Sequence, residues 1–216
     1  TSVTVATTAG PPWTTDGGEV PWDVRFGGER ATATAVADKT ISYVAAGTVA
    51  HANNASVTPA LPAGHAASDL LLILAAIRNS GAGIPSTPTG YTRLDVFQAT
   101  DNVQIFGKID GGSESDPTVS FTGGVANADT SAQMVALRST FYDVSKLVIA
   151  ARAILNDSGQ DIAYPQLPIR YDNSVVLYLG WKQDDWTSVA TIGGATEIGE
   201  PDTVTGDDQG LVWDYV

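Results

Sequence analysis

Two stretches decide the fold class, Leu70-Leu71-Leu72-Ile73-Leu74 and Val103-Gln104-Ile105-Phe106-Gly107-Lys108-Ile109. The first is continuously apolar and of strand length, which predicts a strand buried on both faces. In the second, the odd positions other than Gly107 are apolar, with the polar Gln104 and Lys108 at even positions, which predicts a half-buried strand. Both stretches indicate a protein built from β-sheet.

From about residue 40, short segments of this kind alternate with Gly, Pro and Asp at roughly ten-residue spacing, which is typical of antiparallel sandwiches and barrels. The predicted strands span residues 40–44, 55–61, 70–78, 91–99, 103–109, 118–121, 131–138, 144–154, 175–182, 187–192 and 210–215. Within 145–154, Ser145 could cap a short helix, but the central Val148 and Ile149 favour the strand.

A weak internal sequence repeat refines this prediction. Residues 68–94 and residues 172–198 each combine a polar turn, a long apolar strand, a loop and a strand led by glycine. Two such units suit the two halves of a jelly roll. We therefore predict an all-β fold, an antiparallel jelly-roll-like β-sandwich with an irregular N-terminal arm.

The first 42 residues differ in amino-acid composition from the rest of the chain. Gly and Pro recur every few residues and weaken regular structure, yet Trp13, Trp22 and Phe26 are too large and apolar for a solvated tail. Either the segment packs on its own domain or a neighbouring subunit orders it. We predict a docking arm over residues 1–42, with these three aromatic residues at its interface, and a sandwich domain over 43–216.

Composition narrows the classes of partner. Charged residues make up 16% of the chain, the net charge is −13, and the 11 Lys and Arg are spread thinly. Nucleic acid and anionic membrane surfaces require clustered basic residues, and no apolar run reaches the roughly 18 residues of a membrane helix. We therefore expect no nucleic-acid partner and no membrane partner. The absence of cysteine excludes disulfides, thiolate nucleophiles and zinc–thiolate sites.

Candidate catalytic residues are few. His51 and His65 both lie in the polar, small-residue stretch before the first long strand, and no Gly-x-Ser-x-Gly elbow is present. We interpret both as surface or loop histidines. No His-x-x-x-His or His-Glu-x-x-His pattern is present, so a transition-metal site is not expected. The prediction is a protein without enzymatic activity and without a cofactor.

Two Asp-rich loops offer oxygen ligands of the kind that calcium prefers. One contains Asp157 and Asp161, and the other contains Asp207 and Asp208. Neither has the glycine at position six and the glutamate at position twelve of the helix-flanked calcium loop. Simple Asp/Gly turns are the preferred interpretation, and calcium binding stays a weak alternative.

Asp184-Asp185-Trp186 is the triplet most suggestive of carbohydrate chemistry, because a tryptophan can stack on a sugar face. Adjacent strand residues point to opposite sides, so the two carboxylates share a cleft only if they lie in a turn. A β-turn with a tryptophan closing the sheet end is the preferred interpretation. Glycan binding is the first alternative and glycoside hydrolysis the second.

Three stretches resemble virion structural proteins of tailed bacteriophages, and the likeness covers about residues 45–216. The first is Pro59-Ala60-Leu61-Pro62-Ala63-Gly64-His65-Ala66-Ala67-Ser68-Asp69-Leu70-Leu71-Leu72, and the second is Thr87-Pro88-Thr89-Gly90-Tyr91-Thr92-Arg93-Leu94. The third runs from Arg170-Tyr171-Asp172-Asn173-Ser174 through Trp186-Thr187-Ser188-Val189. These are packing and turn motifs, and the resemblance carries no catalytic residues.

The resemblance implies a jelly-roll-like domain displayed on a capsid, neck or tail, assembled in the host cytoplasm. The expected function is therefore a non-enzymatic virion component, in the first place a capsid decoration or head-spike protein that docks through its arm. By analogy with such proteins it would self-associate, as a homotrimer or another homo-oligomer, and bind other virion proteins. The alternatives are a tail or fibre component, or a lectin-like module that binds a host surface glycan.

Overall fold

The computed structural model describes residues 22–26, 29–33, 41–53, 55–78, 83–98, 102–122, 128–139, 175–183, 194–199 and 209–215. Every regular element among them is a β-strand, and all the strand pairs are antiparallel. The all-β prediction is therefore confirmed. The chain forms two compact units, Thr1–Thr40 and Ile41–Val216, whereas the predicted boundary follows residue 42.

The first unit contains a β-hairpin. Strand β1 (Trp22–Phe26) pairs with β2 (Glu29–Ala33), from Trp22 opposite Ala33 to Phe26 opposite Glu29. The two residues between the strands are Gly27 and Gly28, a sequence typical of two-residue hairpin loops. The structure thus differs from an entirely irregular arm, because apolar and polar residues alternate along β1 as in a strand.

A six-stranded sheet is the centre of the second unit. Its order is β3-β10-β5-β8-β7, and β4 pairs with the same side of β10 as β3 does. The strands are β3 (Ser42–Ala46), β4 (Ala50–Asn53), β5 (Leu70–Ile77), β7 (Thr92–Gln98), β8 (Asn102–Ile109) and β10 (Asp129–Arg138). Between β3 and β4 the chain needs Gly47, since a Cβ there would lie 1.8 Å from the carbonyl oxygen of Ala60.

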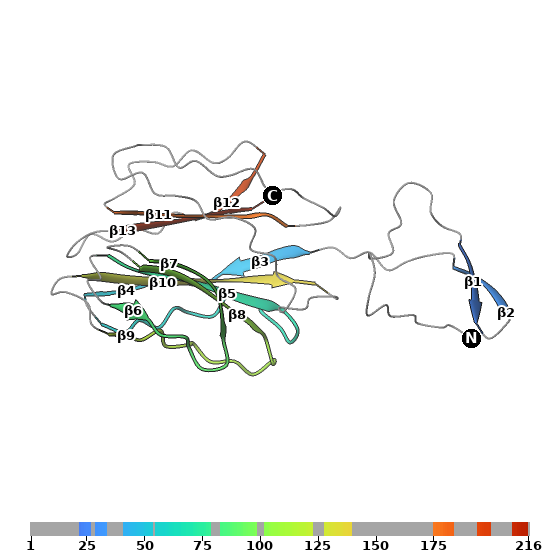
Figure 1. The fold of residues 1–216 in the computed structure, drawn as a ribbon, viewed down its shortest axis with the longest axis horizontal. Helices are drawn as coiled ribbons and strands as arrows, with labels where there is room; N and C mark the ends of the chain where they lie inside the picture. Colours follow the sequence, from blue (N-terminus) through green and yellow to red (C-terminus); the bar gives the residue numbers. More distant parts are fainter. Residues whose placement is uncertain are drawn as a thin grey trace. The chain divides into compact units, whose positions relative to one another are not determined.

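Two smaller sheets accompany it (Figure 1). One has the order β11-β13-β12, from the strands Leu177–Gln183, Gln209–Tyr215 and Thr196–Gly199. The other pairs β6 (Ile84–Pro85) with β9 (Phe121–Thr122). Outside the named strands, Val57 and Val119 form an isolated antiparallel β-bridge.

Strand β5 separates two hydrophobic cores. Its odd-numbered side chains pack in the first core with Phe106, Val119 and Phe121, on the side of β9. Its even-numbered side chains pack in the second core with Leu211 of β13, against which residues of β11 and β12 also pack. All eight residues of β5 are buried, as its continuous apolar sequence predicts. Each buried Leu or Ile side chain contributes about 1.5–3 kcal/mol to folding.

Strand β8 alternates, but not as predicted. Its apolar odd positions, such as Val103 and Ile105, are half-buried against the second core, while Gln104 and Phe106 on the other face are fully buried. Sheets of the protein thus cover both faces of this strand. The alternating sequence correctly separates the residues of the two faces of β8. It wrongly predicts that the face with Gln104 is exposed, since Gln104 and Phe106 are buried.

Other elements differ from the prediction in extent. The predicted strand 55–61 forms only the bridge at Val57, because Pro59 cannot donate to a ladder and the amide of Leu61 binds the Asp116 carboxylate instead. Strand β4 was not predicted, since Ala and Asn are poor strand formers. The predicted strands 144–154 and 187–192 lie outside the described residues. The jelly-roll connectivity stays a prediction.

Candidate functional site

Most residues that the sequence singles out lie outside the described part of the chain. Trp22 and Phe26 are the ends of β1, and only their backbone is described. The predicted residues outside the described ranges are Trp13, Asp157, Asp161, Asp184, Asp185, Trp186, Asp207 and Asp208. The glycan, calcium and arm-interface predictions therefore stay predictions.

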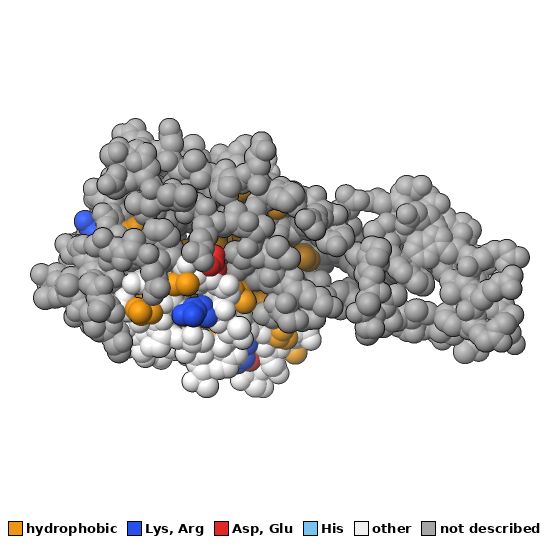
Figure 2. Space-filling model, in the orientation of Figure 1, with side chains coloured by type: hydrophobic (Ala, Val, Ile, Leu, Met, Phe, Trp, Pro, Cys, Tyr) orange, Lys and Arg blue, Asp and Glu red, His pale blue; other side chains and the backbone are white. Residues whose placement is uncertain are grey.

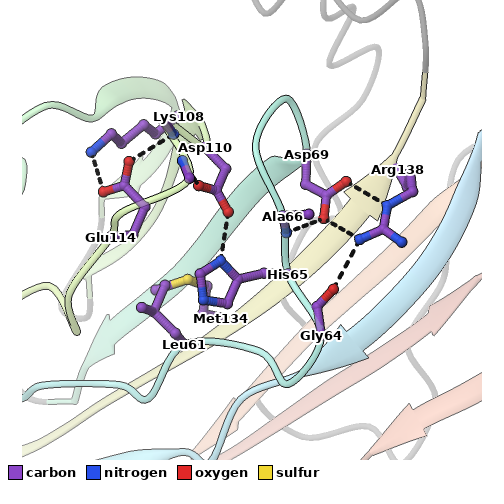
Figure 3. Close-up of polar contacts among 12 residues, drawn as sticks. Leu61, Gly64, His65, Ala66, Asp69, Lys108, Asp110, Glu114, Met134 and Arg138 are labelled. Atoms are coloured by element: carbon purple, nitrogen blue, oxygen red, sulfur yellow. Dashed lines mark hydrogen bonds and ion pairs between the residues drawn. The ribbon is translucent and has the colours of Figure 1, made fainter.

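The densest polar constellation in the described residues lies at one end of the six-stranded sheet (Figure 3). We call it the loop cluster, because it holds the loop of residues 61–69 that leads into β5. Since neighbouring strands are antiparallel, the start of β5 meets the ends of β8 and β10 there. Its ionisable members are His65, Asp69, Lys108, Asp110, Glu114 and Arg138.

Arg138, the last residue of β10, binds the Asp69 carboxylate with two hydrogen bonds. Its Nε donates to Oδ1 and its Nη2 to Oδ2, each at 2.8 Å, and Nη2 also donates to the carbonyl of Gly64 at 2.9 Å. The backbone N–H of Ala66 donates to the same carboxylate at 2.8 Å. The hydrogen bonds from Arg138 hold the pKa of Asp69 below its usual value. The guanidinium thus ties Gly64 and Asp69 of the loop to the end of β10.

His65 binds the second buried carboxylate. Its Nδ1 lies 2.5 Å from Oδ2 of Asp110, whose side chain has no exposed surface. The other oxygen, Oδ1, accepts from the backbone N–H of Gly112 at 2.5 Å. Two backbone hydrogen bonds join the same parts of the chain. The N–H of Ser68 donates to the carbonyl of Asp110, and the N–H of Asp110 donates to the carbonyl of Asp69. Both carboxylate oxygens of Asp110 are therefore engaged.

A third pair borders the cluster. Lys108 Nζ donates to Oε2 of Glu114 at 2.5 Å, and the backbone N–H of Gly111 donates to Oε1 at 2.9 Å. The hydrogen bond from Lys108 lowers the pKa of Glu114. The same ammonium lies 5.7 Å from the ring centre of Tyr91. Burial raises the pKa of the Tyr91 hydroxyl, which donates to the sulfur of Met134 at 3.7 Å.

The loop cluster unites two of the stretches quoted above. The first contributes Gly64, His65 and Asp69. In the second, the N–H of Tyr91 donates to the carbonyl of Pro88 at 3.1 Å across Gly90, which has a φ of +81°. Positive φ at this position is the requirement of a type II turn and favours glycine. Their geometry is that of a locked loop and a tight turn.

His65 is thus a loop histidine, as interpreted from the sequence. Its partner Asp110 is 45 residues away in the chain, and Arg138 is 69 residues away from Asp69. The sequence contains no signal for these pairs, because they depend on strand register at long range. Among the described residues, no group of three His, Asp or Glu side chains is arranged to hold a metal ion.

The other histidine reveals a second arrangement that the sequence does not indicate. His51 of β4 is directly opposite Ser131 of β10, and Asp129 precedes Ser131 by two residues on the same face. The residue types are those of Ser–His–Asp catalysis. However, Ser131 has no exposed surface and Asp129 is only 1% exposed. A substrate therefore has no access to this serine in the structure, and the arrangement belongs to the packed interior.

On the face that Figure 2 shows, the described residues form no broad patch of charged side chains. Lys and Arg side chains in blue and Asp and Glu side chains in red are scattered among uncharged ones. Ile84 of β6, 40% exposed, is the single exposed large hydrophobic residue among those described.

No helix of the described chain is long and apolar enough to cross a membrane. Comparisons with protein-family models, with curated proteins and with solved structures give no match.

Proposed function

We propose that the chain is a non-enzymatic structural component of a tailed-phage virion. In this proposal it is a capsid decoration or head-spike protein that docks through its N-terminal unit and self-associates. The observation that carries the proposal is the division of the chain into the compact units Thr1–Thr40 and Ile41–Val216. The first unit contains Trp13, Trp22 and Phe26, residue types that dominate the binding energy of protein interfaces.

The loop cluster supports a scaffold role for the second unit. Asp69, Asp110 and Glu114 each accept hydrogen bonds from both a side chain and a backbone N–H. Carboxylates used in this way hold loops in place, whereas a general acid or base has to reach its substrate. The stretches that resemble virion proteins therefore have a structural task in this fold, which agrees with a display module.

The proposal is tested by removing the first unit. Residues 41–216 should keep the circular dichroism spectrum and cooperative unfolding of a β-sandwich, yet fail to incorporate into phage particles during assembly. The full-length chain is the positive control, and a Trp22→Ala/Phe26→Ala variant should show reduced incorporation. Normal incorporation of folded residues 41–216 would overturn docking through the N-terminal unit.

A further inference from the structure

A buried amide in the first core has no hydrogen-bond partner. Gln104 of β8 is 1% exposed, and neither its Nε2 nor its Oε1 has a hydrogen-bond partner among the described residues. An amide removed from water without new hydrogen bonds carries its full desolvation cost, which folded proteins rarely leave uncompensated. The described residues therefore give the side chain of Gln104 no hydrogen-bond partner.

The neighbours of Gln104 across the sheet have small side chains. The strand register places Ala75 of β5 opposite Gln104, Ala132 of β10 opposite Ala75, and Ala50 of β4 opposite Ala132. These three alanines form one row across the sheet on the face of the first core. We call it the alanine row. Each of these side chains is a single methyl group, smaller than the side chains in the rows on either side.

Bulky residues border the row on both sides. Ile73 and Phe106 form the pair on one side, and Ile77 and Asn102 form the pair on the other. Asn102 is buried, lies on the same face of β8 as Gln104, and donates from Nδ2 to the carbonyl of Gly83 at 2.9 Å. Its side-chain oxygen can accept a further hydrogen bond. The side-chain amides of Gln104 and Asn102 thus lie at one end of the alanine row, where they offer hydrogen-bonding groups to a molecule as small as water.

We propose that Gln104 binds an internal water molecule over the alanine row. The amide donates from Nε2 and accepts at Oε1, and the side-chain oxygen of Asn102 is a further acceptor two residues along the strand. A buried water with two to four polar partners is a regular part of protein interiors. The row, made of methyl groups alone, offers no hydrogen bonds that a larger polar ligand would need. This inference is independent of the proposed function.

The test is a high-resolution crystal structure of the full-length chain and of its Gln104→Met variant. In the wild type we expect a solvent peak at about 2.7–3.2 Å from Nε2 or Oε1 of Gln104. The peak should be absent in Gln104→Met, which keeps the length of the side chain without its polar atoms. Gln133→Met on the other face of the sheet is the matched control, because Gln133 Nε2 already donates to the carbonyl of Gly47, and it should leave the peak in place.

A second measurement does not require the variants to fold. In solution, the side-chain amide protons of wild-type Gln104 should show a nuclear Overhauser effect to a long-lived water. An amide of Gln104 without solvent density, or one hydrogen-bonded to a protein atom in the crystal, would overturn the proposal. A peak that persists unchanged in Gln104→Met would overturn it as well, because the water would then be held by other groups.

Discussion

At the scale of single residues, the loop cluster shows how two buried carboxylates fix a loop. The Asp69 side chain is 2% exposed and its partner Arg138 is 48% exposed. The bidentate geometry of the pair places the arginine charge where it compensates the buried carboxylate, and charge-assisted pairs of this kind are stronger than neutral ones. Because about half of the Arg138 side chain is exposed to solvent, screening reduces the contribution of the pair.

The first prediction concerns Asp69→Asn. We expect a loss of about 1–3 kcal/mol in unfolding free energy at neutral pH, because the amide cannot replace the carboxylate toward Arg138. In the folded protein the pKa of Asp69 is lowered from 3.8, so the carboxylate stabilises the fold above pH of about 4 and loses this effect as the pH falls through the lowered pKa. Denaturant unfolding between pH 7 and pH 3 should show the variant and the wild type converging.

The control for this prediction is Glu197→Gln at an exposed position of β12, which should change the unfolding free energy by no more than about 0.5 kcal/mol at any pH. A constant difference between Asp69→Asn and the wild type over the whole pH range would contradict the role of the ionised pair.

The second prediction concerns the pair of His65 and Asp110. His65→Ala leaves the fully buried Asp110 carboxylate with the N–H of Gly112 as its remaining side-chain contact, so we expect a loss of about 1–3 kcal/mol. Asp110→Asn in the His65→Ala background should cost less than it does alone. A double-mutant cycle measures this coupling, expected at about 0.5–3 kcal/mol. Strict additivity would show that the two side chains do not stabilise each other.

At the scale of elements, β5 is the strand on which both cores depend. Leu72 and Ile73 are consecutive, yet Leu72 packs in the second core and Ile73 in the first. The strand can be apolar at every position because sheets cover it on both sides. An antiparallel strand with one wet face would instead alternate.

The third prediction follows from this double burial. Leu72→Ala and Ile73→Ala should each reduce the unfolding free energy by about 2–5 kcal/mol, because each leaves a cavity in a different core. Ile84→Ala, at the exposed position of β6, is the control and should cost less than about 1 kcal/mol. A small effect of Leu72→Ala beside a large effect of Ile73→Ala in denaturant unfolding would show that the three-stranded sheet does not cover the second core.

The elements also show what the sequence can predict. The apolar run of β5 predicts its double burial because no residue in it is polar. Gln104 misleads, since a polar residue in an alternating strand is expected at the surface and here lies in the first core. The loop cluster cannot be predicted either. Its ion pairs join residues far apart in the chain, and their meeting depends on the register of β5, β8 and β10.

At the scale of the whole molecule, the chain combines a net charge of −13 with few charged residues. Mutual repulsion of copies favours solubility, so the proposed self-association would have to come from apolar contacts that outweigh this repulsion. The aromatic residues of the Thr1–Thr40 unit are suited to that task. Docking through this unit is the central claim of the proposed function.

Electron cryo-microscopy of tailed-phage particles assembled in the presence of the chain tests this claim most directly. The account predicts density for the β-sandwich on the particle, with the segment around Trp13, Trp22 and Phe26 in contact with a neighbouring protein. Particles that lack the chain, or that hold it through the sandwich while residues 1–40 make no contact, would contradict the account.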